Sequence, residues 1–315
     1  MTVSPDFAVV VVNYGAHAMI ARNLPARGDL DGAAVYVVDN PSTVVERAAV
    51  ADLCARRGWN LVPSAANKGF GSGVNQGVRA AIADGAEVVV LLNPDAAASG
   101  VALSSLARGV RDDPITVASP RVVTSSGHAE FSGAVVSLRT GRIRSAWVPE
   151  DDDPEWVNWL TGACMAFDRE TFEAVGGFDP GYFMYWEDVD FSRRVVEQGR
   201  RLAVREDLEI HHDQGGTHTA RGSRAKSPLY YYWNCRNRLV FGRRFARVSW
   251  LRWLIATPAE SRLIFLRGGR RQLLSDPGTL CAAVRGTAAG VVGLRHASVG
   301  GRITAADRPR AGGRR

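Results

Sequence analysis

An aromatic run at residues 182–186 is followed within four positions by three carboxylates, Glu187, Asp188 and Asp190. Glycines and a proline precede the run, which predicts a loop leading into a helix with Glu187 and Asp188 in its first turn. The positive end of a helix tolerates anions there. A carboxylate that is ionised, partly desolvated and held on a rigid element suits a general base. The alternative interpretation is an acidic helix cap.

Polar residues that could bind a cation follow two other apolar stretches. Asp95 comes after residues 87–92 and a proline, where a carboxylate is well placed to hold a divalent cation that bridges a diphosphate. His211 and His212 follow an apolar segment, and one of these imidazoles could be a further metal ligand. A plain turn aspartate and a strand-end histidine are the alternative interpretations.

Residues suited to a nucleotide lie earlier in the chain. Tyr14 and Asp39 follow apolar stretches, and an aromatic face with an acceptor could stack on and hydrogen-bond a nucleobase. Asn67, Lys68 and Gly69 open a glycine-rich segment that could approach phosphates, with Lys68 as counter-charge. This segment is neither a Walker A sequence nor GxGxxG, and tight packing of a strand–helix turn is its alternative interpretation.

The elements that must position these residues alternate between strand and helix. Residues 7–12 are a continuous apolar run rich in valine, typical of a strand buried on both faces of a parallel sheet. Further strands are predicted at 34–38, 61–63 and 87–92, with a helix at 43–57 and helices ending near Leu24 and Ala83. The polar residues gather at the carboxyl ends of the strands, the edge at which open α/β sheets bind ligands.

The pattern changes after residue 120. We expect a β-hairpin at 131–138 and 141–147 and an apolar strand at 156–167, interrupted near Thr161. Residues 150–155 are predicted to form a solvated loop and 308–315 to be disordered. The remaining predicted elements are a helix at 169–175, a strand at 202–204, a segment ending at His212, and helices at 229–245, 250–267 and 279–292.

Composition narrows the class of protein. The chain has 315 residues, 46% of them hydrophobic, enough for one large domain or a domain with an appendage. Its net charge is +7, and the basic excess lies in residues 241–315, with fifteen arginines and three acids. Four separated cysteines argue against structural zinc and fit a reduced cytoplasmic setting. Residues 7–12 are too short for a signal peptide, and without a run of about 18 apolar residues we expect no membrane span.

The order of the motifs resembles the GT-A glycosyltransferases of family 2, in particular the bacterial rhamnosyltransferase-like and galactofuranosyltransferase-like members. This order is base site, phosphate loop, metal aspartate, catalytic carboxylate and histidine, and it covers roughly residues 6–245. The matching motifs are VVVNY (10–14), VVDNPS (37–42), NKGFGSGVN (67–75), LNPDA (92–96), TGAC (161–164), GFDPGYFMYWEDVD (177–190) and RNRL (236–239).

The resemblance implies an α/β fold of GT-A type, Rossmann-like, with a mostly parallel central sheet and a basic, helical C-terminal extension. The catalytic domain would span residues 1–225, with a nucleotide-sugar half at about 1–118 and an acceptor half at about 119–225. The helical extension would occupy 226–307, followed by the tail at 308–315.

It also implies an inverting transfer from a nucleotide sugar, with Asp188 as general base. Tyr14 and Asp39 would hold a pyrimidine base. The ribose–diphosphate path would be lined by Asn67, Lys68, Gly69, Asn75 and Asn93. The acceptor site would be lined by Thr161, Gly162, Tyr185, Trp186 and Glu187, although ordinary core packing is the alternative for the aromatic rings.

Asp95 corresponds to the last aspartate of the family's DxD motif and would bind Mg²⁺ or Mn²⁺ on the diphosphate. His212, or else His211, would be the metal-binding histidine that follows the catalytic carboxylate. The motif here reads Asn93-Pro94-Asp95, so a neutral amide replaces one carboxylate and metal affinity should be lower. Many rhamnosyltransferase-like members share this form, so the change does not exclude activity.

The partners implied are a nucleotide-sugar donor, such as dTDP-rhamnose or another dTDP- or UDP-sugar, and a cell-envelope glycan or polyprenyl-diphosphate-linked acceptor. The alternatives are a transferase for a soluble natural product and a catalytically silent scaffold that binds nucleotide sugars. Arginines and tryptophans in residues 245–315 predict either peripheral contact with an anionic membrane, at the inner face of the plasma membrane, or helices packed on the catalytic domain. No nucleic-acid module accompanies the charge, so we expect a cytoplasmic protein without a nucleic-acid partner.

Overall fold

A computed structural model describes residues 5–30, 32–124, 127–148, 155–212, 226–246, 250–267, 269 and 276–297. The first part contains β1 (Phe7–Asn13), α1 (His17–Asn23), η1 (Arg27–Asp29), β2 (Ala33–Asp39), α2 (Val44–Arg57), β3 (Asn60–Pro63), α3 (Phe70–Ala83), β4 (Val88–Leu92), β5 (Ala96–Ala97) and α4 (Gly100–Asp112). The second part contains β6 (Thr116–Val123), β7 (Ala129–Phe131), β8 (Ala134–Ser137), β9 (Ile143–Arg144), β10 (Trp156–Trp159), β11 (Cys164–Asp168), α5 (Arg169–Val175), α6 (Glu187–Glu197) and β12 (Arg201–His212). The last helices are α7 (Pro228–Phe245), α8 (Trp250–Arg267) and α10 (Pro277–Ala297).

The central sheet is mostly parallel, as the sequence predicts. Its strands run in the order β3-β2-β1-β4-β11-β6-β12-β5, and β7 pairs with β6. The strands β3, β2, β1 and β4 pair in parallel, as do β6 and β12, whereas β11 lies antiparallel between β4 and β6. β1 and β4 are buried along their whole length, because strands in the middle of such a sheet are covered on both faces.

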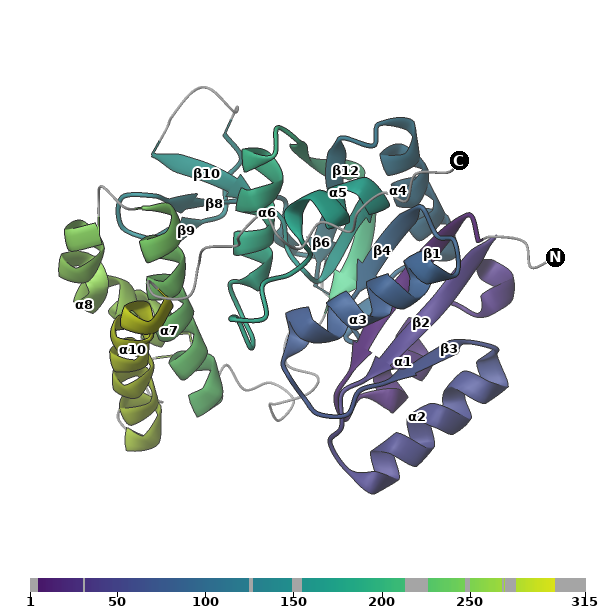
Figure 1. Cartoon of the computed structure of the whole chain (residues 1–315), viewed down its shortest axis with the longest axis horizontal. Coiled ribbons are helices and arrows are strands. Elements are labelled where there is room, and N and C mark those ends of the chain that lie inside the picture. The colour runs from purple at the N-terminus through teal and green to yellow at the C-terminus, as the bar shows by residue number, and fades with distance from the viewer. Residues whose placement is uncertain are drawn as a thin grey trace, which may run out of the picture.

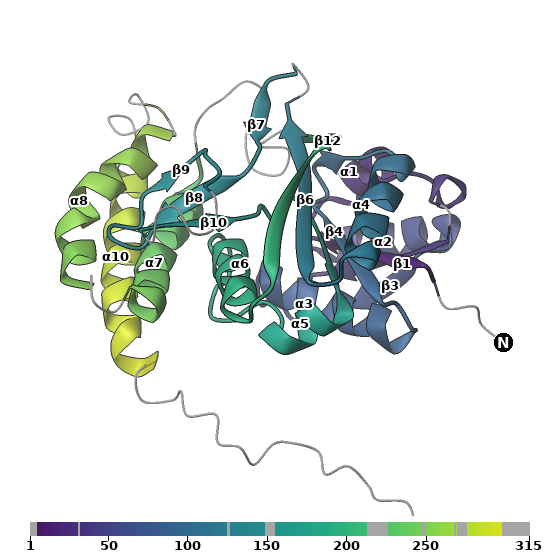
Figure 2. The same ribbon diagram turned by 90° about the horizontal axis from the view of Figure 1, so that it is seen from above.

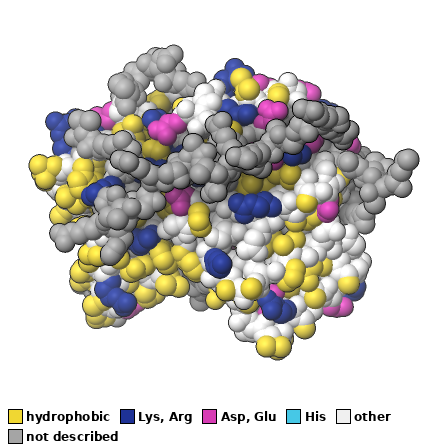
Figure 3. Space-filling view, viewed as in Figure 1, with side chains coloured by type: hydrophobic (Ala, Val, Ile, Leu, Met, Phe, Trp, Pro, Cys, Tyr) yellow, Lys and Arg dark blue, Asp and Glu magenta, His cyan; other side chains and the backbone are white. Residues whose placement is uncertain are grey.

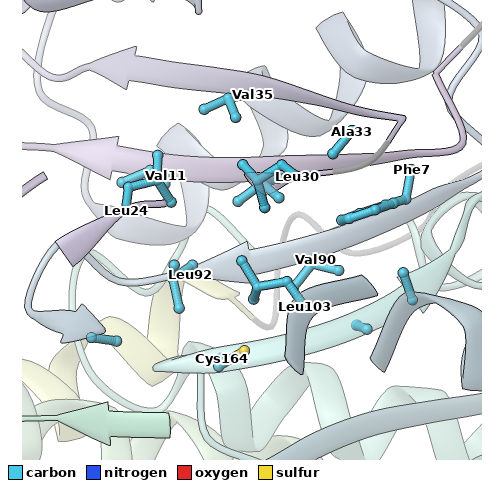
Figure 4. Packing of buried hydrophobic residues seen from close by; sticks show 14 of the residues in the cluster. Phe7, Val11, Leu24, Leu30, Ala33, Val35, Val90, Leu92, Leu103 and Cys164 are labelled. Carbon is cyan, nitrogen blue, oxygen red and sulfur yellow. The ribbon is translucent and has the colours of Figure 1, made fainter. Parts of the chain in front are cut away.

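Helices cover both faces of this sheet, which gives three layers (Figure 1). One face packs against α1, α2 and α4 through residues such as Ile20, Val50 and Leu103, and Figure 4 shows part of this cluster. The other face packs against α3, α5 and α6 through residues such as Val78 and Phe191. Each fully buried side chain of this size stabilises the fold by about 1.5–3 kcal/mol, so both layers hold the strand ends in place.

A small second sheet joins the central sheet to the C-terminal helices. Its strand order is β10-β8-β9, and it lies between these two parts of the molecule (Figure 2). Trp186 and Val189, at the start of α6, share a hydrophobic cluster with Phe241 of α7 and Trp253 of α8. The C-terminal helices therefore pack against the start of α6, as one of the two predictions for this segment has it.

The predicted elements are found with three changes. Phe131 belongs to β7, which pairs with β6, whereas the predicted hairpin consists only of β8 and β9 in the small sheet. The apolar segment at 156–167 divides between the two sheets as β10 and β11. The segment at 202–204 extends into one long strand, β12. Most of the loop at 150–155 and the tail at 308–315 lie outside the described residues.

The four cysteines are free. Within the described parts of the chain, no helix combines the length and the apolar character needed to cross a membrane.

Candidate active site

One edge of the central sheet brings the predicted residues together. β1 and β2 end in register at Asn13 and Asp39. β11 begins beside the end of β4, and His212, at the end of β12, pairs with Ala96, the residue after Asp95. The predicted convergence at the carboxyl ends of the parallel strands is thus confirmed for these elements.

Asp188 lies in the first turn of α6, and both of its oxygens accept backbone hydrogen bonds. Oδ2 accepts from the Gly162 N–H at 3.1 Å and Oδ1 from the Val189 N–H at 2.9 Å. Thr161 stabilises the turn that supplies Gly162, since its Oγ1 accepts from the Ala163 N–H at 3.2 Å. Burial raises the pKa of Asp188 to about 6, and the backbone donors oppose a larger rise. Such a carboxyl group is mostly ionised at pH 7 yet basic enough to take a proton.

The two neighbouring carboxyl groups have different surroundings. Glu187 is buried, and its Oε2 has no hydrogen-bond partner among the described residues. Burial, followed by the charge of Asp188, raises the pKa of Glu187 well above its ordinary value, and the buried side chain has little surface for the predicted acceptor contact. Asp190 is fully buried and binds Arg194 at 2.6 Å and Arg244 at 3.0 Å. The Asp190 carboxylate is therefore engaged in ion pairs with these two arginines.

The chain enters α6 through two residues with left-handed backbone, Tyr185 (φ 65°) and Trp186 (φ 73°). Across the residues described here, no other non-glycine residue has a positive φ. This conformation costs of order 1–3 kcal/mol at each residue and persists only where the surroundings impose it. Strained backbone directly before Asp188 indicates that the placement of this carboxylate is constrained.

His212 bridges two carboxylates. Its Nε2 lies 3.2 Å from Asp95 Oδ1, and its Nδ1 lies 3.2 Å from Glu130 Oε2. Burial by itself lowers the pKa of His212, but the hydrogen bonds and charges of Asp95 and Glu130 outweigh it and raise the pKa to about 10. His211 is exposed. Of the two histidines predicted as alternatives, His212 is therefore the one that meets Asp95.

These donors fit a divalent cation. A carboxylate oxygen of Asp95 is a ligand for Mn²⁺ and Mg²⁺, and an imidazole nitrogen of His212 is a ligand for Mn²⁺ once a bound cation displaces its proton. Asn93 Oδ1 is buried without a hydrogen-bond partner in the described structure, so an amide oxygen is also unused. In that same part of the chain, no three His, Cys, Asp or Glu side chains form a ready metal site. A cation here would need ligands from beyond these side chains.

Backbone hydrogen bonds connect the Asp95 segment with Asp188. The Asn93 N–H donates to the Ala163 carbonyl at 2.9 Å, and the adjacent Gly162 N–H binds Asp188 at 3.1 Å. A chain of backbone hydrogen bonds therefore links the Asp95 turn to Asp188 through the turn before β11.

The predicted base-binding residues differ in exposure. Tyr14 is 45% exposed, so its ring is free to stack on a ligand. Asp39 is 1% exposed, and its carboxylate accepts hydrogen bonds from Asn13 Nδ2 and Arg47 Nε, both at 3.1 Å. A nucleobase would have to share Asp39 with these two donors.

The predicted phosphate loop forms the turn before α3. Asn67 Oδ1 accepts from the Gly69 N–H at 2.9 Å, and Lys68 is exposed. Gly69 has a φ of 92°, and a Cβ at this position would lie 2.1 Å from the Phe183 carbonyl oxygen. Glycine is required here because the turn touches the loop that leads to α6.

The residues that follow in this segment make contacts within the protein. Asn75 is buried, with its Nδ2 donating to the Phe178 carbonyl at 2.7 Å and its Oδ1 accepting from the Phe178 N–H at 2.8 Å. Its amide fastens α3 to the segment before the aromatic loop and is not available to a nucleotide. Gly71 and Gly73 lie in the first turn of α3 against Phe178 and Val12, so they serve tight packing, as the alternative interpretation has it.

The predicted aromatic platform does not form at Trp186, which is 4% exposed within the cluster shared with α7 and α8. Partly exposed rings lie beside it. Tyr185 meets Tyr230 edge-to-face at 5.2 Å, and Phe183 stacks on Trp233 at 5.1 Å. The aromatic surface near the site is therefore built by the loop and α7 together.

Sequence reasoning missed three polar side chains. Glu130 sits in a strand of three residues, too short to show a pattern. Arg47 lies in α2, shortly after the Asp39 motif, and a single arginine on a helix does not indicate a functional role. Asn237 lies in the RNRL motif (236–239) and proves fully buried, but nothing in the motif distinguishes its contacts from those of Asn234 on the same helix.

The mostly parallel central sheet with helices on both faces is a fold of GT-A type. The family model described as "Glycosyltransferase like family 2" matches residues 5–227. The chain belongs to this family and is a glycosyltransferase.

Two curated relatives and one solved structure illustrate the similarity. The low-salt glycan biosynthesis hexosyltransferase Agl10 of Haloferax volcanii is 25% identical over 244 residues, covering 76% of each chain. The N-acetylglucosaminyl-diphospho-decaprenol L-rhamnosyltransferase of Mycobacterium tuberculosis is 51% identical over 43 residues, 14% of each chain. The mannosyltransferase PcManGT from Pyrobaculum calidifontis, in complex with GDP-Man and Mn²⁺, matches with a TM-score of 0.53 at 18% identity, covering 95% of this chain and 87% of that one. At this identity the structural likeness supports the fold alone.

Proposed function

We propose that this glycosyltransferase performs an inverting transfer with Asp188 as the general base. The observation that carries the proposal is the Asp188 carboxylate, held by the Gly162 N–H and with a pKa of about 6. A base of this strength can remove the proton of an attacking hydroxyl at neutral pH. The backbone donors fix the direction in which the carboxylate faces.

The reaction balances with one proton transfer to the protein. The acceptor oxygen bonds to the anomeric carbon on the face opposite the leaving group, the bond from that carbon to the diphosphate breaks, and Asp188 takes the hydroxyl proton. Burial and the charge of Asp188 raise the pKa of Glu187, which disfavours a second negative charge beside the base.

The donor side of the proposal uses the sheet edge. Tyr14 would stack on a pyrimidine base, Asp39 would accept from its polar edge, and Lys68 would offset the diphosphate charge. Asp95 and His212 would hold Mg²⁺ or Mn²⁺, which when bound stabilises negative charge on the departing diphosphate. The Mn²⁺ bound to the mannosyltransferase of similar fold supports a divalent cation here, whereas its GDP-Man carries a purine and does not bear on the choice of base.

We propose dTDP-rhamnose, or another dTDP- or UDP-sugar, as donor and a cell-envelope glycan or polyprenyl-diphosphate-linked intermediate as acceptor. The name of the mycobacterial relative supports both, since that protein transfers L-rhamnose to a decaprenol-linked acceptor and shares 51% identity over 43 residues. The partly exposed rings of Tyr185 and Tyr230 support a sugar acceptor, because sugar CH faces pack well on aromatic rings.

A lipid-linked acceptor would bring the protein to a membrane, and the C-terminal helices offer a suitable surface. Exposed apolar side chains on α8 and α10 are Leu251, Ile255, Leu263, Leu280, Val284, Val291 and Val292. Exposed arginines on these helices are Arg252, Arg262, Arg267 and Arg285. In the described parts of α8 and α10 no acidic side chain is exposed. Figure 3 shows hydrophobic and basic side chains side by side at this end of the molecule, a combination that suits an anionic lipid surface.

Vesicle flotation tests this surface. The protein should bind phosphatidylglycerol vesicles and not phosphatidylcholine vesicles, and the double variant Leu251→Ser, Ile255→Ser should lose most of that binding. Val44→Ser, at an equally exposed apolar side chain on α2, is the matched control and should bind like wild type. Equal binding by the double variant and the control would contradict the proposal.

The donor is tested with a panel of dTDP-, UDP- and GDP-sugars in Mg²⁺ or Mn²⁺, scored by saturation-transfer NMR and by slow donor hydrolysis. We expect one metal-dependent hit among the dTDP- or UDP-sugars. No binding and no hydrolysis across the panel would refute the donor assignment.

A further inference from the structure

The loop that leads into α6 is held by α7, the first of the C-terminal helices. Asn237 of α7 donates from Nδ2 to the carbonyls of Met184 at 2.9 Å and Tyr185 at 2.8 Å. Its Oδ1 accepts from Arg236 Nη1 at 2.6 Å, and the same nitrogen of Arg236 donates to the Gly181 carbonyl at 3.0 Å. Asn237 is fully buried, so water cannot replace it in these bonds.

The other side of the loop is held by the start of α3. The Phe70 N–H donates to the Phe183 carbonyl at 2.9 Å, and Gly69 permits this close approach. The carbonyls of residues 181, 183, 184 and 185 are therefore all fixed, two of them by Asn237 alone. Figure 2 shows α6 between α3 and α7, which agrees with a loop clamped from both sides.

The hydrogen bonds from Asn237 lie at the strained part of the loop. Tyr185 and Trp186 have left-handed backbone, and Asn237 binds the carbonyls at and directly before the first of them. Trp186 precedes α6 without any side-chain cap hydrogen bond, so the usual device that fixes the start of a helix is missing. Asp188 is only two residues further on. A relaxed turn would rotate the first turn of α6 and move the carboxylate.

We propose that Asn237 is a positioning residue for the general base. Through Asn237, α7 contributes to the geometry of the active site. Its amide imposes the left-handed turn, and the turn aims Asp188 at the acceptor hydroxyl. The catalytic consequence rests on the proposed role of Asp188 and is independent of which sugar is transferred. The positioning itself can be measured without substrate.

The first arm of the test compares Asn237→Ala with Asn234→Ala. Asn234 is a buried asparagine on the same helix, but its Nδ2 donates to the Tyr230 carbonyl of that helix at 2.9 Å. Asn237→Ala should lower kcat about 10- to 100-fold through misplacement of the base, while the donor KM stays within about twofold, because the donor-binding residues lie elsewhere. Asn234→Ala should keep the wild-type kcat. Equal kcat values for the two variants would overturn the proposal.

The second arm uses hydrogen exchange of the full-length protein. The amides of residues 185–190 should exchange at least about tenfold faster in Asn237→Ala than in Asn234→Ala. Equal exchange at these amides would overturn the positioning role. Because this measurement needs no substrate, it separates failure of the positioning role from failure of the proposed transfer reaction.

If Asn237→Ala does not fold, Arg236→Gln serves the same purpose, since Arg236 is only partly buried and supports both Asn237 and Gly181. This variant should lower kcat about tenfold and speed exchange at the same amides. Wild-type values of both quantities would overturn the proposal.

Discussion

Replacing Asp188 by asparagine should stabilise the protein, and the gain should grow with pH. Burial raises the pKa of Asp188 from 3.8 to about 6, so the folded state keeps its proton at a higher pH than the unfolded chain. The folded protein therefore loses stability as the pH rises from about 4 to about 6, where the unfolded chain has already released this proton. Asparagine cannot ionise, so the variant escapes this loss.

The size of the effect follows from the shift. About two pKa units correspond to about 3 kcal/mol of lost stability above pH 7, and roughly half of this is already lost at pH 5. The asparagine side chain also carries N–H donors, which a carboxylate lacks. Leaving such a buried donor unpaired costs about 1–2 kcal/mol at any pH. The difference in unfolding free energy between variant and wild type should thus rise by about 1–2 kcal/mol from pH 5 to pH 8.

Urea unfolding of both proteins at pH 5 and pH 8 measures this rise. Asp52→Asn is the matched control, since Asp52 is exposed on α2 and paired with an exposed Arg56; its effect should change by less than about 0.5 kcal/mol between the two pH values. A difference for Asp188→Asn that is the same at pH 5 and pH 8 would refute the raised pKa, and with it the case for Asp188 as a tuned base.

Three further substitutions test other parts of the account. Glu130→Gln should weaken Mn²⁺ binding about 10- to 100-fold by calorimetry, because Glu130 orients the His212 ring; wild-type affinity would contradict the assignment of His212 to the metal. Asn75→Ala should lower the unfolding free energy by about 2–5 kcal/mol in urea titrations, since it leaves the buried N–H and carbonyl of Phe178 unpaired, and a loss below about 1 kcal/mol would argue against that clamp. Glu187→Gln should reduce the transfer rate by less than the roughly 100-fold that loss of an acid–base group costs, because burial raises the pKa of Glu187 and disfavours its charged form, and glutamine is likewise uncharged; a larger loss would assign it a proton-transfer role.

The order of strands and helices could be predicted because the apolar runs are strong and regular. The buried run of β1 and the polar residues at strand ends fixed the sheet edge where the site lies, and the family motifs paired Asp95 with His212 across 117 positions. The strands and the sheet edge follow from period and order along the chain, whereas the pairing of Asp95 with His212 was implied by the family resemblance.

The contacts that escaped prediction depend on distant backbone. Asn75 binds the backbone of Phe178, 103 positions away, and nothing in either segment distinguishes that bond from a ligand contact. Trp186 is turned into the core by a left-handed backbone. Glycine is the usual sign of that conformation in a sequence, and it is absent at this position. Glu130 reaches His212 from a strand whose pairing with β6 contains a register shift, and such irregularities re-aim side chains without changing the apolar pattern.

The central claim, that Asp188 is the base of a glycosyl transfer, is tested most directly by the transfer rate at saturating donor and acceptor between pH 5 and pH 8. The wild-type rate should rise with an apparent pKa of about 6 and level off above pH 7. Asp188→Asn should be about 10²- to 10⁴-fold slower and lack this rise. A variant that transfers at near the wild-type rate, with the same rise, would contradict the claim.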